Sequence, residues 1–338
     1  MFICGQKRFC GKISTVNKEI DLWHFVRDRL EQNQPVMLLV VADSAGSSPG
    51  RQGYKMAVVA DGELCGSIGG GLMEVKLVEL AKGKSKKAKG KNADEIVDQV
   101  HRKDALNASG MICSGKQTVI FKQITSDDLQ TVKTIIDVIN TRKLSYLIIT
   151  PTQFRTWPAK VGTSDDFTFK KLSDTDFIYE EEIGKKSDLY IIGGGHCALA
   201  LSELMSKMDF HIRIFDDRPQ LNTIEKNKFA DEITIIDAYE RIGELIRAGS
   251  NVYVVLMTLG YSSDEVVIRQ LINHDLKYFG VLGSKAKMKT LLTALEKDGF
   301  AKEKLDRIHA PIGLSINSRT PEEIAVSIAA EIISVKNP

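Results

Sequence analysis

Two loops in the first half of the chain have residue types that bind anions through the backbone. Residues 46–53 read GSSPGRQG, and residues 66–74 read GSIGGGLME. Three successive glycines, Gly69, Gly70 and Gly71, lead into a helical pattern and leave backbone N–H groups open to a phosphate or another anion. The polar residues that we expect to complete this site are Ser47, Ser48 and Arg51.

The second loop differs from a nucleotide-hydrolysing P-loop. Leu72 and Met73 stand where a Walker sequence has Lys-Ser/Thr, so the loop does not indicate an ATPase. Glu74 falls in the first turn of the expected helix. There its carboxylate either takes part in the binding site or only stabilises the positive end of the helix dipole.

Cys113 is the cysteine whose position best fits sulfur chemistry. It stands in GMICSG (residues 110–115), beside a small turn at the start of an expected strand. An exposed thiolate there would act as a soft ligand or a sulfur carrier, whereas a buried thiol would be inert. The five cysteines are odd in number and widely spread, which argues against a secreted disulfide framework. No Ser-His-Asp order, His-Glu-x-x-His motif or zinc-type spacing is present, so we assign no catalytic residue and no metal ligand.

The second half carries the strand–glycine–helix pattern of dinucleotide-binding proteins. Residues 189–198 read LYIIGGGHCA, in which Gly193 permits a tight turn and Gly195 lets a pyrophosphate approach. Asp216 ends the next expected strand, where it would accept hydrogen bonds from a ribose. His196 would contact an anion or metal, or else bond to the backbone. Arg218 would bind a phosphate or carboxylate, or form an internal ion pair.

Hydrophobic periodicity predicts the elements that position these residues. In the first part we expect a helix within 14–32, a buried strand at 36–42, a hairpin over 54–67 turning at Asp61-Gly62, a helix at 72–81, a strand at 112–124, a helix at 127–140 and a strand at 145–150. The lysine-rich stretch 82–91 is expected to be a solvated loop. Residues 151–184 are expected to be irregular.

From Asp188 onward, strands and helices alternate, which predicts a parallel, doubly wound sheet with its ligand site at the carboxyl ends of the strands. The expected strands are 189–192, 212–215, 252–257 and 278–282, and the expected helices are 199–208, 239–247, 264–272 and 285–298. Thr320, Pro321 and Glu323 predict a capped start for a last helix over 324–335. The fold class is therefore α/β, with a domain over 1–184 that includes the lysine-rich loop and a linker, and a Rossmann-like domain over 185–338.

Composition bounds the class of protein. With 338 residues and 43% hydrophobic residues, the chain is long enough for two domains of roughly 100–200 residues each. The formal net charge of +2 lacks the basic field that nucleic-acid binding requires, so we expect no nucleic-acid partner. The start of the chain has no signal-peptide core and no apolar run near the roughly 20 residues of a membrane helix. We therefore expect a cytoplasmic protein without a membrane partner.

Taken together, the motifs resemble the XdhC/CoxI family of xanthine dehydrogenase accessory proteins. The resemblance rests on Gly46 to Pro49 with Lys55-Met56, Gly66 to Gly71 with Glu74, the Cys113 turn, Gly193 to His196, Asp216 to Pro219, Gly280 to Lys287, Ala310 to Leu314 and Thr320 to Ala325. It implies an XdhC/CoxI-type α/β domain followed by a Rossmann-like XdhC domain. It also implies binding of the molybdenum cofactor (molybdopterin), with assistance in sulfuration and insertion into a xanthine-dehydrogenase-type molybdoenzyme. A cysteine desulfurase partner and a homodimer follow from the same resemblance.

The chain departs from the family pattern at Thr258-Leu259-Gly260-Tyr261, where a histidine-containing turn is common, at the Cys-Ser-Gly turn, and at Arg51, which is displaced by one place. Two alternative functions use the glycine-rich turn of the second domain. One is an NAD(P)-dependent oxidoreductase, and the other is a nucleotide-sensing regulator in which the first domain signals. The oxidoreductase alternative lacks a recognisable substrate domain and proton-transfer set in this sequence.

Overall fold

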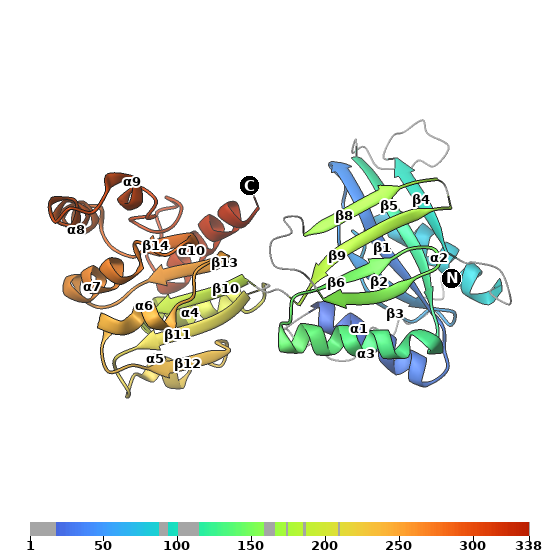
Figure 1. The fold of residues 1–338 in the computed structure, drawn as a ribbon, viewed down its shortest axis with the longest axis horizontal. Coiled ribbons are helices and arrows are strands. Elements are labelled where there is room, and N and C mark those ends of the chain that lie inside the picture. Colours follow the sequence, from blue (N-terminus) through green and yellow to red (C-terminus); the bar gives the residue numbers. More distant parts are fainter. Residues whose placement is uncertain are drawn as a thin grey trace, which may run out of the picture. The chain divides into compact units, whose positions relative to one another are not determined.

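The computed structural model describes residues 18–87, 94–100, 115–158, 166–173, 175–184, 187–208 and 210–337. The chain divides into two compact units, Met1–Lys185 and Lys186–Pro338 (Figure 1). Each unit has its own β-structure and its own hydrophobic core, and we describe each by itself.

An antiparallel five-stranded sheet forms the centre of the N-terminal unit. Its strands are β1 (Val36–Gly46), β2 (Lys55–Val59), β3 (Leu64–Gly66), β4 (Glu95–Val100) and β5 (Gly115–Ile124), in the order β3-β2-β1-β5-β4. Residues 36–42 of β1 are all buried, which confirms the prediction of a fully buried strand. The hairpin of β2 and β3 around Asp61-Gly62 is also confirmed. Strand β4 was not predicted from the residue pattern.

Helices cover both faces of this sheet. On one face, α2 (Gly71–Lys87) packs Leu77, Val78 and Ala81 against alternate residues of β1, β2 and β5. On the other face lie α1 (Lys18–Glu31) and α3 (Leu129–Thr141), which run side by side (Figure 1). The short helix η1 (Ser126–Asp128) leads into α3. Residues 82–87 continue α2 instead of forming the expected loop, because lysine is a good helix former, and residues 88–91 of that stretch lie outside the described residues.

A second antiparallel sheet lies over α1 and α3 and shares their core. Its strands are β6 (Ser145–Ile149), β7 (Phe154–Pro158), β8 (Phe167–Lys171) and β9 (Phe177–Ile183), in the order β7-β6-β9-β8. The expectation of an irregular segment after residue 150 is therefore wrong. In β9 every second residue is buried, and Glu181 is one of them. This buried charge hid the two-residue period that identifies a strand.

The C-terminal unit is built on a parallel sheet, which confirms the predicted doubly wound architecture. Its strands are β10 (Ser187–Ile192), β11 (Phe210–Asp216), β12 (Glu232–Ile235), β13 (Gly249–Leu256) and β14 (Leu276–Val281). The spatial order is β12-β11-β10-β13-β14, and every neighbouring pair is parallel. The chain order reverses between β10 and β13, and ligands of such sheets bind at this switch point.

Two layers of helices cover the parallel sheet. One layer contains α4 (His196–Met205) and α10 (Pro321–Lys336), and the other contains α6 (Ile242–Leu245), α7 (Tyr261–Leu271) and α8 (Lys285–Lys297). The remaining short helices are α5 (Asn222–Glu225), η2 (Tyr239–Arg241) and α9 (Lys302–Leu305). The predicted cap of α10 is confirmed, because Thr320 and Glu323 form a capping box with Pro321 at the first helical position. In the part of the chain that the structure describes, no helix combines the length and apolar character needed to cross a membrane.

Candidate functional site

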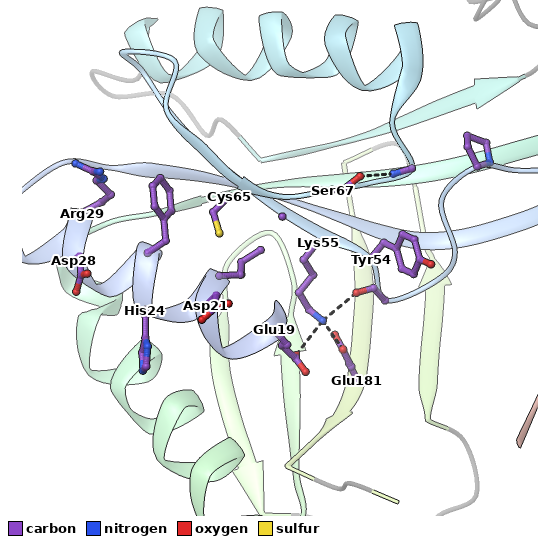
Figure 2. Close-up of a pocket in the computed structure, with 16 residues that line it drawn as sticks. Glu19, Asp21, His24, Asp28, Arg29, Tyr54, Lys55, Cys65, Ser67 and Glu181 are labelled. Carbon is purple, nitrogen blue, oxygen red and sulfur yellow. Dashed lines mark hydrogen bonds and ion pairs between the residues drawn. The ribbon is translucent and has the colours of Figure 1, made fainter. Parts of the chain in front are cut away.

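The described part of the N-terminal unit contains a pocket of about 890 Å³ beside α1 (Figure 2). Small-molecule sites typically have volumes of about 300–1,000 Å³, so the pocket is large enough for a cofactor-sized ligand. One wall is α1, and the other walls are residues 49–55, residues 65–69 and Glu181 of β9. Parts of both predicted glycine-rich loops therefore border the same pocket.

Close backbone contact joins these two loops. A Cβ atom on Gly69 would lie 2.4 Å from the backbone nitrogen of Gly50, and a Cβ on Gly50 would lie 2.2 Å from the carbonyl oxygen of Ile68. Gly69 also has a φ of 124°, which side chains of L-residues rarely permit. Glycine is thus required at both positions by the packing of one loop on the other.

The anion-binding donors of the second loop are used by the chain itself. Oε2 of Glu74 accepts hydrogen bonds from the Ser67 hydroxyl at 2.7 Å, the Ile68 N–H at 3.0 Å and the Gly70 N–H at 2.9 Å. The Gly69 N–H donates to the Ser67 hydroxyl oxygen at 3.2 Å. The side chain of Glu74 therefore does more than stabilise the helix dipole. Its carboxylate binds the loop's hydrogen-bond donors in the way that an external anion would. An external anion at these donors would have to displace it.

The other predicted residues of the first loop differ in accessibility. Ser48 is buried and donates to Oε1 of Gln117 at 2.9 Å, while Nε2 of Gln117 donates to the carbonyl of Ile68 at 3.0 Å. This bridge ties the two loops together below the surface. Ser47 and Arg51 are exposed, and a guanidinium nitrogen of Arg51 lies 3.4 Å from the Gly46 carbonyl oxygen.

A buried ion pair forms the floor of the pocket. Lys55 of β2 and Glu181 of β9 lie 126 positions apart in sequence, and their Nζ and Oε1 atoms are 2.5 Å apart. Nζ of Lys55 also donates to the Gly53 carbonyl at 3.1 Å and lies 3.4 Å from Oε1 of Glu19 on α1. The Tyr179 hydroxyl donates to Oε2 of Glu181 at 2.9 Å. Figure 2 shows Glu19 and Glu181 converging on the Lys55 ammonium.

The electrostatics of this group follow from its burial. Burial acts to lower the pKa of Lys55, but the carboxylates of Glu181 and Glu19 outweigh it and hold that pKa above its usual value. Burial and the neighbouring Glu181 carboxylate raise the pKa of Tyr179 well above its usual value. Burial also raises the pKa of Glu181, although the Lys55 ammonium and the Tyr179 hydroxyl act to lower it.

Two cysteines are relevant to this region. Cys113, the predicted soft ligand or sulfur carrier, lies outside the described residues. Cys65 lines the pocket and is half-buried, although no role was predicted for it from the residue pattern. The structure thus adds a thiol to the pocket wall.

In the C-terminal unit, the glycine-rich turn after β10 has the expected strand-to-helix geometry. Gly193 has a φ of 104°, and a Cβ there would lie 2.4 Å from the carbonyl oxygen of Met257, so the turn requires glycine. Gly195 is the N-cap residue of α4, and a Cβ on it would meet nothing within 4 Å. His196 begins α4 and is exposed. The backbone at Gly195 is therefore open to a ligand.

Asp216 differs from the free acceptor that a ribose would need. The residue is fully buried, and its two carboxylate oxygens accept four hydrogen bonds. Oδ2 accepts from the Gly194 N–H at 2.6 Å and from the Arg218 guanidinium at 2.6 Å, and Oδ1 accepts from the N–H and Nε of Arg218. Burial acts to raise the pKa of Asp216, but these hydrogen bonds hold it below its usual value. The predicted acid and guanidinium are thus paired with each other.

A second buried carboxylate lies near the carboxyl edge of the parallel sheet. Asp264 of α7 is fully buried, accepts from the Thr258 hydroxyl at 2.6 Å, and pairs with Nζ of Lys287 at 2.6 Å. Thr258 begins the turn that departs from the family pattern, and here its hydroxyl helps to fix the start of α7. The ion pair between Asp264 and Lys287 links α7 to α8.

The sequence did not identify Glu19, Lys55 and Glu181 as a group. The available signals were a lysine inside a buried strand, a glutamate in a strand with a two-residue period, and several acidic residues in the first helix. The structure shows that three of these acidic residues line the pocket. None of these signals indicates which partner lies across the unit. Only the packing of the two sheets brings the residues together.

The fold and the sites define a protein that joins a Rossmann domain to an antiparallel α/β unit with a ligand-sized pocket. Residues 189–332 match the XdhC Rossmann domain, and residues 29–90 match the XdhC and CoxI family. The chain belongs to the XdhC/CoxI family, which confirms the resemblance that its motifs indicated. The matched residues 29–90 include both glycine-rich loops and the start of α2.

Several known proteins are similar to this chain over most of its length. A Bacillus subtilis protein named as a probable xanthine dehydrogenase subunit is 25% identical over 91% of this chain and 95% of its own length. The uncharacterized protein YqeB of Escherichia coli is 27% identical over 91% of this chain, which spans only 44% of that relative. In fold, the chain resembles the crystal structure of a xanthine dehydrogenase from Bacillus halodurans, with a TM-score of 0.72, 22% identity, and coverage of 94% and 95% of the two chains.

Proposed function

We propose that this chain is an accessory protein of a xanthine-dehydrogenase-type molybdoenzyme. In this proposal it binds the molybdenum cofactor as cargo, assists its sulfuration and delivers it to the enzyme. The family membership supports an accessory role, and so does the similarity to the Bacillus subtilis protein whose name links it to xanthine dehydrogenase. A cysteine desulfurase as sulfur donor and a homodimeric state belong to the same proposal.

The observation that carries the proposal is the pocket beside α1. It has the volume of a cofactor site, and its walls contain parts of both loops that carry the family resemblance. The alternative site, at the Rossmann turn, offers an open backbone at Gly195 but no free ribose acceptor, because Asp216 is paired with Arg218. The pocket therefore supports cargo binding better than the Rossmann turn supports a dinucleotide.

The pocket residues fit a ligand with a flat heterocycle and an anionic end. Tyr54, an exposed aromatic residue of the lining, supplies contact area for a ring. Arg29 supplies a cation, whose guanidinium is paired with Glu63 and lies over the Phe25 ring. A guanidinium binds phosphate through its N–H groups. Arg29 would thus hold the phosphate of molybdopterin in place of the Glu63 carboxylate.

In this function the chain acts by binding and shielding. The cargo itself supplies the molybdenum and sulfur chemistry. The residues of the pocket hold the ring, exclude water from it and release it to the partner enzyme. The Lys55–Glu181 pair keeps the floor of the pocket rigid, because its charges neutralise each other inside the unit.

The test is retention of molybdenum by the purified full-length chain. Cofactor released anaerobically from a molybdoenzyme is mixed with the chain, and molybdenum that elutes with the protein in gel filtration is measured by elemental analysis. We expect the wild-type chain to retain molybdenum and Arg29→Ala to retain much less. Lys133→Ala is the control, since Lys133 lies on the neighbouring helix α3 and pairs with Glu31, and neither residue lines the pocket.

Two results would count against the proposal. If the wild-type chain retains no molybdenum, the chain is not a carrier of this cofactor. If NAD(H) or NADP(H) alone raises the melting temperature, while molybdenum cofactor does not, the dinucleotide function is favoured instead.

A further inference from the structure

A second cavity lies in the C-terminal unit, at the amino end of β14. Its volume is about 310 Å³, at the lower end of the range for small-molecule sites. Its lining comes from two segments, residues 271–279 and residues 304–309. The glycine-rich turn follows the carboxyl end of β10, and because β10 and β14 belong to one parallel sheet, the cavity lies at the opposite edge of that sheet.

Three exposed cationic side chains, Lys277, Lys304 and Arg307, line this cavity. Among the described residues, Lys277 has no hydrogen-bond or ion-pair partner. Nζ of Lys304 donates to the neutral amide oxygen of Asn273 at 2.7 Å. The guanidinium of Arg307 lies 4.0 Å from the exposed carboxylate of Asp275. The positive charge at this cavity is therefore largely unneutralised.

This cavity differs in its charge from the sites described above. Among the described residues that line it, the one acidic side chain is that of Asp306. At the other sites each cation has a carboxylate partner, and these ion pairs are Lys55–Glu181, Arg29–Glu63, Arg218–Asp216 and Lys287–Asp264.

His309 adds a polar ring to the lining, and contacts below the cavity hold this ring in place. Its Nδ1 lies 3.4 Å from Oε1 of Glu331 on α10, and its ring packs on Tyr278 with the two centroids 4.5 Å apart. The Tyr278 hydroxyl donates to Oε2 of the same Glu331 at 2.5 Å. Among the described residues, Nε2 of His309 has no partner, so this nitrogen is available to a ligand.

We propose that this cavity binds the phosphoryl group of a small phosphorylated molecule, with Lys277, Lys304 and Arg307 as the cations that hold it. A phosphate monoester carries a charge of about −1.5 to −2 at neutral pH and three strong acceptor oxygens, so it can engage several cations at once. A carboxylate has a single charge and only two oxygens. The inference goes beyond the proposed function, because the cavity lies in the C-terminal unit and the cargo pocket in the N-terminal unit.

Phenyl phosphate and benzoate provide a direct test. The two molecules carry the same ring and differ in the anionic group. Binding of each to the full-length chain is measured by isothermal titration calorimetry at constant ionic strength in a buffer free of phosphate. We expect phenyl phosphate to bind about tenfold more tightly than benzoate, because its further charge and oxygen add charge-assisted hydrogen bonds.

Variants locate the bound phosphate. Lys277→Met and Arg307→Met are each expected to weaken phenyl phosphate binding about fivefold, because each removes one exposed charge partner. Asp306→Asn should tighten it about twofold, because the lining loses its negative charge. Lys289→Met is the matched control and should bind as the wild type does, since Lys289 is exposed on α8 and does not line the cavity. Circular dichroism melts check that each variant is folded.

Three results would overturn the inference. They are equal affinity for phenyl phosphate and benzoate, no binding of phenyl phosphate, and phenyl phosphate binding that is unchanged in both Lys277→Met and Arg307→Met. The last result would mean that the phosphate binds elsewhere, for example at the open backbone of Gly195.

The gel-filtration assay separates this inference from the proposed function. Lys277→Met is expected to retain molybdenum as the wild type does, because Lys277 does not line the cargo pocket. Loss of molybdenum from a folded Lys277→Met variant would overturn the assignment of a separate phosphate site. If the wild-type chain retains no molybdenum but prefers phenyl phosphate as expected, the proposed function fails and this inference stands.

Discussion

The buried Lys55–Glu181 pair gives the sharpest prediction for the stability of the N-terminal unit. The two side chains are 6% and 7% exposed, and each is the other's nearest counter-charge. Lys55→Met leaves the Glu181 carboxylate buried without a cation, and Glu181→Leu leaves the ammonium with only the more distant Glu19. Removing one partner of a buried pair typically destabilises a protein by about 3–5 kcal/mol, so each single variant is expected to lose about that much.

The double variant Lys55→Met/Glu181→Leu is expected to be more stable than either single variant. It contains neither buried charge, and its main defect is the Tyr179 hydroxyl, which loses its acceptor on Glu181. A buried group left without a partner costs about 1–3 kcal/mol. The double variant should therefore lose about 1–3 kcal/mol, compared with about 6–10 kcal/mol if the two single losses were additive.

Tryptophan fluorescence reports this unit alone. The chain has two tryptophans, and both Trp23 and Trp157 belong to the N-terminal unit. Trp23 is fully buried in the core and packs against Phe154, so its emission changes when that core opens. Urea unfolding of the four proteins, followed by fluorescence, gives the free energies of unfolding. If the two single losses simply add in the double variant, the reasoning from a coupled buried pair is wrong.

Three further predictions concern the glycine turn, Asp216 and Glu74. Gly193→Ala should lower the melting temperature strongly, because its Cβ would meet the Met257 carbonyl oxygen. Gly195→Ala should lower it only slightly, because its Cβ meets nothing within 4 Å and alanine is a weaker N-cap residue than glycine. Equal melting temperatures would contradict the geometry of the turn. Because the pKa of Asp216 is lowered on folding, its stabilisation is complete above the unfolded value of about 3.9 and is lost as the pH falls through the folded value. The stability gap between wild type and Asp216→Asn, measured by far-UV circular dichroism, should therefore close below about pH 4, and a constant gap would exclude this linkage. Glu74→Ala should lower the free energy of unfolding, measured in the fluorescence assay, by about 1–3 kcal/mol, because three hydrogen-bond donors lose their acceptor. Glu74→Gln should lower it less, because the amide retains an acceptor oxygen. Equal losses in the two variants would assign the effect to the charge of Glu74.

Much of the fold could be predicted because it depends on short-range patterns. The buried strand at 36–42, the Asp-Gly hairpin, the βα alternation after residue 188 and the capping box of α10 each depend on a few neighbouring residues. The strand predicted at 145–150 is confirmed as β6 of the second sheet, but β9 was missed because Glu181 is a charged residue on its buried side. Its burial depends on Lys55, which pairs with it from a distant part of the chain.

The candidate site was predicted only in part. The two glycine-rich loops were identified, and packing places parts of both on one pocket. Residue types alone could not show that the Gly70 N–H donates to Glu74 or that Asp216 pairs with Arg218. A carboxylate next to a donor in sequence binds either an external ligand or the donor itself, and the choice depends on the backbone path between them.

The architecture of the C-terminal unit, the family and the glycine-rich loops are predictable from residue order, because periodicity, turn residues and ordered motifs are local properties of the chain. Which charged side chains pair with each other depends on the packing of distant segments. Glu19, Lys55 and Glu181 come from a helix and from strands of two different sheets, and only the packing of those elements brings them within hydrogen-bond distance. Electrostatic pairing falls steeply with distance and depends on burial, so it follows from the three-dimensional arrangement.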